Sequence, residues 1–94
     1  MPSQVVTIAS SVGLHARPAS LLVKAAGASG LSVTIGRPGD KAVNAASMLM
    51  VLALGVKHNE QVEITIAEGD NANEVLTSLV EILETNHDEE NPSA

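Results

Sequence analysis

The chain has 94 residues, a net charge of −6 at pH 7, no cysteine and no aromatic residue. This length predicts one small domain, whose single core must be built from Val, Leu, Ile, Ala and Met side chains. The acidic balance and the lack of aromatic rings argue against nucleic-acid binding and against anionic membrane surfaces, and the lack of cysteine excludes disulfides and thiolate metal sites.

Targeting signals and metal-ligand patterns are also missing from the sequence. No basic N-terminal region precedes an apolar run, and no apolar stretch approaches the length of a membrane span. We therefore expect a soluble cytoplasmic protein. His58 and His87 fall in polar segments without a second ligand at a suitable spacing, so we expect no metal site.

The N-terminal part of the chain reads as a strand followed by a helix. Residues 4–9 alternate in polarity, with Val6 and Ile8 on one side, which predicts a strand with one buried face. From Ala16 onward, apolar residues recur at the spacing of one helical face. The glycines within residues 27–30 are expected to end this helix.

A hairpin is expected next. Residues 31–35 alternate in polarity, the Arg-Pro-Gly-Asp run at 37–40 is a strong turn signal, and residues 41–44 form a short returning strand. We expect Arg37 to be a solvated charge of this turn.

The remaining elements are a short helix, a strand and a last helix. Residues 47–54 are apolar on nearly every side, so a helix there cannot bury all of its side chains against one sheet. Residues 62–66 alternate as a fourth strand, and Asp70 can cap the last helix. We expect a folded domain over 1–84 and an acidic, disordered tail over 85–94, where the composition is too polar to form a core.

The order of elements indicates the fold class. Strand, helix, strand, strand, helix, strand and helix follow one another, and each predicted strand has only one apolar face. The economical arrangement is an α+β domain with a four-stranded, mainly antiparallel sheet and the three helices packed on one side.

Residues 13–20, Gly-Leu-His-Ala-Arg-Pro-Ala-Ser, carry the most chemistry. Pro18 suits the first turn of a helix, and the backbone N–H groups of such a turn, here at Ala16 and Arg17, form an anion seat. The Arg17 guanidinium adds a donor for phosphate oxygens, and His15 could act as a nucleophile through a neutral imidazole nitrogen. The alternative is an exposed loop histidine beside a solvated arginine, and these residues alone leave it open.

Two segments resemble the HPr family of the bacterial phosphoenolpyruvate-dependent sugar phosphotransferase system. Residues 13–20 resemble its phosphohistidine signature, and residues 43–55 resemble its regulatory-serine segment. The resemblance implies an open-faced α+β sandwich in which Nδ1 of His15 accepts a phosphoryl group from Enzyme I, Arg17 stabilises it, and EIIA proteins or domains receive it. It implies no metal or diffusible cofactor on this chain.

The resemblance also implies regulation and a partner surface. Ser47 aligns with the regulatory serine, although an N-cap is the simpler explanation of a serine there. Ala46 stands where related proteins often carry a basic residue, which weakens the case for recognition by a serine kinase or phosphorylase. A transcription regulator is a further candidate partner. The residues expected at the partner surface are Ser20, Leu21, Lys24, Met48, Leu49 and Leu52.

Other functions remain open at this point. A regulatory phosphocarrier of a nitrogen-related branch would share His15 and differ only in its partners. A non-enzymatic interaction module is the alternative from another class, and a small-ligand-binding domain lacks an evident pocket-forming sequence. We expect a monomer, because the surplus apolar surface is already assigned to transient partners.

Overall fold

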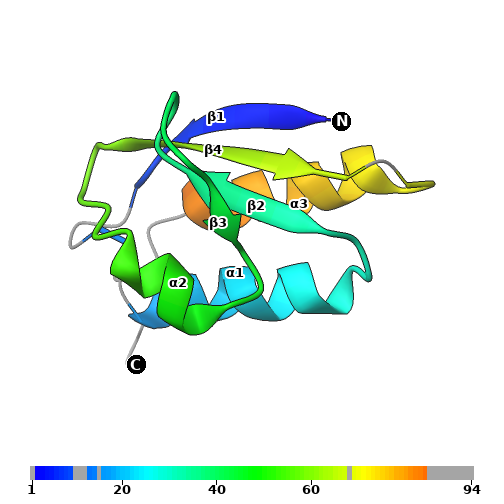
Figure 1. The fold of residues 1–94 in the computed structure, drawn as a ribbon, viewed down its shortest axis with the longest axis horizontal. Helices are drawn as coiled ribbons and strands as arrows, with labels where there is room; N and C mark the ends of the chain where they lie inside the picture. Colours follow the sequence, from blue (N-terminus) through cyan, green and yellow to red (C-terminus); the bar gives the residue numbers. More distant parts are fainter. Residues whose placement is uncertain (1, 10–12, 15, 68, 85–94) are drawn as a thin grey trace.

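The computed structural model describes residues 2–9, 13–14, 16–67 and 69–84. Within these residues, strands and helices follow the expected order (Figure 1). The strands are β1 (Ser3–Thr7), β2 (Val33–Gly36), β3 (Val43–Asn44) and β4 (Gln61–Ile66), and the helices are α1 (Ala16–Ala28), α2 (Met48–Ala53) and α3 (Ala72–Glu84). The tail predicted over 85–94 lies outside the described residues.

The described strands form one sheet in the order β1-β4-β2-β3, and all neighbouring strands are antiparallel. Strand β4 lies in the middle, where Val62 pairs with Val6 of β1 and Ile64 pairs with Ile35 of β2. The three helices lie on one side of this sheet (Figure 1). The α+β architecture expected from the order of elements is confirmed.

The core lies between the sheet and the helices. Alternation along β4 places Val62, Ile64 and Ile66 inward and fully buried, while the intervening residues are exposed or half-buried. Helices α1 and α3 cover them with one apolar face each, because their apolar residues recur every three to four positions. The buried helical side chains include Ala19, Leu22, Ala26, Val51, Leu76, Leu79, Val80 and Leu83. No helix in the described part of the chain has the length and apolar character needed to cross a bilayer.

Several boundaries differ from the sequence-based expectation. Helix α1 continues through Gly27 to Ala28. Helix α3 begins at Ala72, two residues after Asp70, the residue expected to cap it. Strand β3 has only two residues, because the hairpin turn takes up more of the chain than its turn signal indicates.

Candidate functional site

The N-terminus of α1 is the predicted anion seat. The helix begins at Ala16, and Ala16 and Arg17 are exposed while Pro18 and Ala19 are buried. Burial of Pro18 and Ala19 anchors the first turn against the core, and the first backbone N–H groups of any helix have no acceptor within that helix. Such a helix end favours anions. His15 precedes this turn directly in sequence but lies outside the described residues.

The backbone before the seat is docked onto the segment that follows α2. The amide N of Leu14 donates to the carbonyl O of Val56 at 2.9 Å, and the Leu14 side chain is buried. Gly13 has φ +82°, and a Cβ there would lie 2.5 Å from the Val56 oxygen and 2.8 Å from Cα of Lys57. Only glycine satisfies both the left-handed backbone and this close approach. Sequence reasoning missed the role of Val56, because nothing in its local pattern shows which loop its carbonyl meets.

Ser47 forms the N-cap of α2. Its backbone is extended (φ −108°, ψ 111°) and its Oγ accepts a hydrogen bond from the amide N of Met50 at 3.3 Å. The preceding turn is held by Oδ1 of Asn44, which accepts from the amide N of Ala46 at 2.9 Å. The N-cap expected for Ser47 is therefore confirmed. At the other end, Gly55 adopts φ +64° after the last turn, as expected for a helix terminator.

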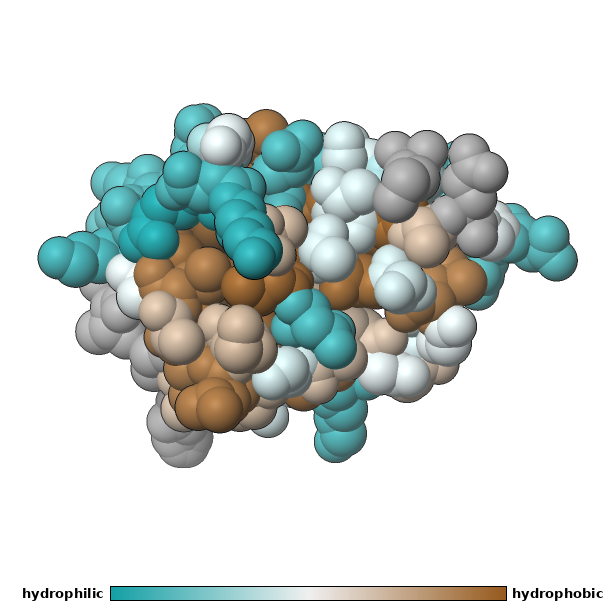
Figure 2. Space-filling model, viewed as in Figure 1, coloured by the Kyte–Doolittle hydropathy of each residue, from teal (hydrophilic) through white to brown (hydrophobic). Residues whose placement is uncertain are grey.

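Helix α2 exposes much of its apolar surface. Leu49 is 77% exposed, Met50 42% and Leu52 40%, whereas Val51 is completely buried. We call Leu49, Met50 and Leu52 the α2 patch; Figure 2 shows hydrophobic surface gathered over this helix. Leu49 and Leu52 thus lie on the surface, as a partner surface would require. Met48 is half-buried and packs against the core, and the more exposed methionine is Met50, which the sequence-based selection missed.

The other expected partner residues lie on α1. Ser20, Leu21 and Lys24 are all exposed, and Leu21 is an exposed large apolar residue with 38% of its surface accessible. Helices α1 and α2 pack against each other, and Figure 1 shows them side by side. The structure therefore brings these exposed residues, the N-terminus of α1 and the α2 patch onto two adjacent helices.

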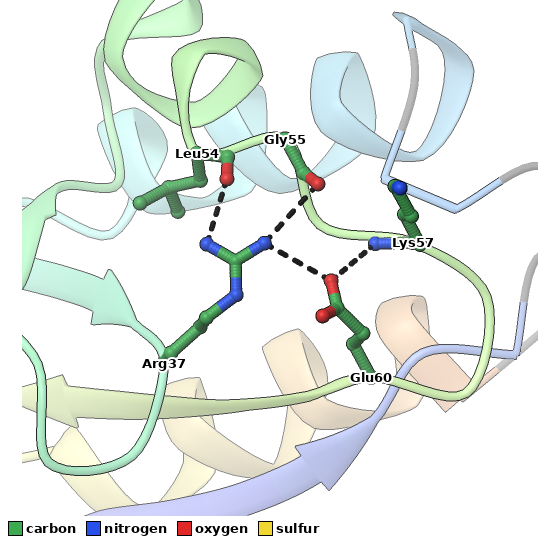
Figure 3. Close-up of polar contacts among 5 residues, drawn as sticks. All are labelled: Arg37, Leu54, Gly55, Lys57 and Glu60. Atoms are coloured by element: carbon green, nitrogen blue, oxygen red, sulfur yellow. Dashed lines mark hydrogen bonds and ion pairs between the residues drawn. The ribbon is translucent and has the colours of Figure 1, made fainter.

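Arg37 is not the solvated turn charge that its sequence context suggests. Its Nη1 donates to the carbonyl O of Leu54 at 2.8 Å, and its Nη2 donates to the carbonyl O of Gly55 at 3.1 Å and to Oε1 of Glu60 at 3.0 Å (Figure 3). The same Oε1 accepts from the amide N of Lys57 at 2.8 Å. A turn signal cannot reveal these partners, because they come from a segment about twenty residues further along the chain.

The surroundings of Glu60 favour the carboxylate form of its side chain. The hydrogen bond from the amide of Lys57 lowers its carboxyl pKa, and the hydrogen bond and positive charge of Arg37 lower the pKa further. Both interactions favour the carboxylate over the neutral acid. Through Oε1, the Glu60 carboxylate therefore joins the amide of Lys57 to the guanidinium of Arg37. The described residues contain no group of three or more side chains that could hold a metal ion.

The described residues define a small α+β protein in which the N-terminus of one helix lies on the surface beside a second, exposed apolar helix. Residues 2–85 match the protein family described as "PTS HPr component phosphorylation site". Two curated relatives are phosphocarrier proteins HPr. The one from Haloferax volcanii is 48% identical over 81 residues, spanning 85% of this chain and 90% of the relative. The one from Streptomyces coelicolor is 40% identical over 83 residues, spanning 88% of each.

A solved structure agrees with these relatives. The crystal structure of HPr-C-His from Thermoanaerobacter tengcongensis has a TM-score of 0.85 and 33% sequence identity, and the match covers 97% of this chain and 100% of that one. The chain therefore belongs to the HPr family, the phosphocarrier proteins of the phosphotransferase system. This role serves sugar transport and implies partners such as Enzyme I and EIIA proteins.

Proposed function

We propose that this protein carries a phosphoryl group on His15, accepting it from phospho-Enzyme I and passing it to EIIA proteins or domains of sugar permeases. The Nδ1 lone pair of the neutral imidazole attacks the phosphorus atom. The P–N bond of the donor phosphohistidine breaks, and its electron pair stays on the donor imidazole while His15 keeps its proton on Nε2. The observation that carries this proposal is the start of α1 at Ala16, directly after His15 in sequence.

The first turn of α1 supports the transfer electrostatically. The backbone N–H groups at Ala16 and Arg17 and the Arg17 guanidinium can neutralise charge on the phosphoryl oxygens as it develops. The same positive surroundings disfavour the imidazolium form of His15, which keeps its lone pair available. An Arg17→Ala variant should transfer more slowly with its fold intact, and an unchanged transfer rate would remove Arg17 from the mechanism.

The decisive experiment is the intact-protein mass after incubation with phosphoenolpyruvate, magnesium and Enzyme I. We expect one added phosphoryl group that is lost on acid treatment and absent from His15→Ala. The matched control is His58→Ala, which removes an exposed histidine from the turn before β4 and should still be phosphorylated. If the folded wild-type protein gains no mass from a competent Enzyme I, the interaction-module function replaces the carrier function. Phosphorylation that serves no sugar permease would instead indicate the nitrogen-related branch.

The α2 patch, together with Ser20, Leu21 and Lys24 on α1, is the proposed docking surface for these partners. Exposed Leu49 and Leu52 offer apolar area that a partner would bury, and an unbranched methionine side chain adapts to partners of different shape. A Leu49→Asp substitution should weaken binding to Enzyme I. Its control is Val5→Asp on β1, which changes a residue that is 44% exposed on the sheet face away from the helices. Equal affinities of both variants for Enzyme I would contradict the assignment.

Ser47 is the proposed site of regulation by a serine kinase and phosphorylase. Its Oγ caps α2 at the border of the α2 patch, so a phosphoryl group would add about two negative charges there. The cost of desolvating them would oppose partner binding. We also propose a cytoplasmic monomer, with a phosphocarrier domain over residues 1–84 and an acidic tail over 85–94. A stable dimer in sedimentation would contradict the monomer.

A further inference from the structure

The segment 54–60 follows α2 and contacts the backbone of Gly13 and Leu14, which precede the proposed phosphoacceptor His15. The carbonyl of Val56 accepts from the amide N of Leu14, the last described residue before His15. Gly13 approaches the same carbonyl and Cα of Lys57 so closely that a Cβ would not fit. The position of the Leu14 backbone therefore depends on where the Val56 carbonyl is held.

One peptide unit carries this dependence. The carbonyl of Val56 and the amide N–H of Lys57 belong to the same planar group. On one edge the carbonyl accepts from Leu14 at 2.9 Å, and on the other edge the N–H donates to Oε1 of Glu60 at 2.8 Å. A carboxylate acceptor polarises the amide, and hydrogen bonds in such a chain strengthen one another. Glu60 thus both orients the Val56–Lys57 peptide and makes its carbonyl a stronger acceptor for Leu14.

Arg37 holds this arrangement from the sheet. It follows β2, a strand packed in the core, and its guanidinium ion-pairs with the same Oε1 of Glu60 at 3.0 Å. It also donates to the carbonyls of Leu54 and Gly55 (Figure 3). The Gly55 carbonyl and the Val56 amide share the preceding peptide plane, so only the two dihedral angles of Val56 separate the plane that Arg37 holds from the plane that Glu60 holds. The ion pair with Glu60 and the hydrogen bonds to Leu54 and Gly55 thus both help to fix the position of the Val56 carbonyl, which accepts from Leu14.

We propose that Arg37 and Glu60 are a positioning pair for the phosphoacceptor loop, acting through the Val56–Lys57 peptide on the backbone of Leu14. The pair makes no contact with the phosphoryl group in this proposal. Its effect on transfer rests on the proposed function of His15, whereas its effect on Leu14 does not.

The test is an Arg37→Met variant, which keeps the apolar stem and removes every donor of the guanidinium. The control is Lys41→Met, which removes a positive charge from an exposed position of the same hairpin. Amide hydrogen exchange is followed at Leu14 and at Ile64, a buried residue of β4 that pairs with both neighbouring strands. We expect Arg37→Met to accelerate exchange at Leu14 roughly ten times more than at Ile64. The reason is that loss of hydrogen bonds to a charged group shifts the local opening equilibrium by about that factor or more. Lys41→Met should not change the exchange rate at Leu14 more than the exchange rate at Ile64.

A purely structural role of Arg37 predicts a different result. Loss of overall stability would change exchange at Leu14 and Ile64 by the same factor, and that outcome would overturn the proposal. If Arg37→Met does not fold, Arg37→Lys serves in its place. It keeps the charge but lacks the fork that reaches two carbonyls and a carboxylate together, so it should show the same selectivity with a smaller change.

Transfer kinetics provide the second readout. In phosphorylation by Enzyme I, we expect kcat of Arg37→Met to fall by more than KM rises, because the backbone before His15 loses its support while the Ser47 cap still holds the first turn of α2. If Arg37→Met shows selectively faster amide exchange at Leu14 but a normal kcat, the pair does not affect phosphoryl transfer, and that part of the proposal is overturned. Failure of the proposed function would look different: the wild-type protein itself would gain no phosphoryl group, while the exchange experiment would still report on Leu14.

Discussion

A Gly13→Ala substitution should destabilise the domain through two separable effects. The first is backbone strain, because Gly13 has φ +82° and a left-handed backbone costs an alanine about 1–2 kcal/mol. The second is a collision, because the new Cβ would lie 2.5 Å from the Val56 carbonyl oxygen and 2.8 Å from Cα of Lys57. Both are backbone atoms, so relief requires the chain to move, at a cost of about 1–3 kcal/mol. The expected loss in the free energy of unfolding is therefore about 2–5 kcal/mol.

A matched substitution isolates the collision. Gly39 has φ +85°, but a Cβ there would meet no atom within 4 Å, so Gly39→Ala should lose only the strain of about 1–2 kcal/mol. Urea unfolding followed by far-ultraviolet circular dichroism measures both variants, since the chain has no aromatic residue to report by fluorescence. Equal losses for the two substitutions would refute the close packing of Gly13 on Val56 and Lys57.

Three further outcomes are expected from the same unfolding measurement. Ser47→Ala should lose about 1 kcal/mol, because the first turn of α2 would lose its capping acceptor; no loss would mean that the cap contributes nothing. On the same helix, Val51→Ala should cost about 2 kcal/mol since Val51 is fully buried, whereas Leu49→Ala should cost less than about 0.5 kcal/mol; similar losses would contradict the orientation of α2. Because the pKa of Glu60 in the folded protein lies below its ordinary value of 4.5, its stabilising contribution is complete above that value and disappears as the pH falls through the folded pKa. Glu60→Gln should therefore flatten the pH dependence of stability in the acidic range, and an unchanged profile would show that Arg37 and Lys57 do not favour the carboxylate.

Local patterns predicted the elements that carry their own signal. The alternation of Val62, Ile64 and Ile66 was enough to predict a half-buried strand, since side chains on successive residues of a strand point to opposite faces. The start of α1 also followed from its own residues, because Pro18 suits a first turn. Both elements depend on neighbours in the sequence, and both are confirmed.

Features that depend on distant partners could not be predicted in the same way. Helix α2 has fewer than two turns and an almost entirely apolar sequence, so only packing against the core decides that Met48 turns inward and Met50 outward. A charged residue in a turn is usually solvated, and the interactions of Arg37 with Leu54, Gly55 and Glu60 exist only once the hairpin and the chain after α2 have come together. The contacts that hold the backbone around the candidate site could therefore not be predicted from the sequence.

The attachment of α2 at both ends has a consequence for recognition. Ser47 caps its first turn, and Arg37 binds the carbonyls that follow its last turn. A protein that docks on the α2 patch meets a backbone whose conformational freedom is already lost in the free state, so association orders only side chains such as Leu49 and Met50. If partners dock there as proposed, those of different shape need only new side-chain rotamers on the α2 patch, and the helix itself need not refold.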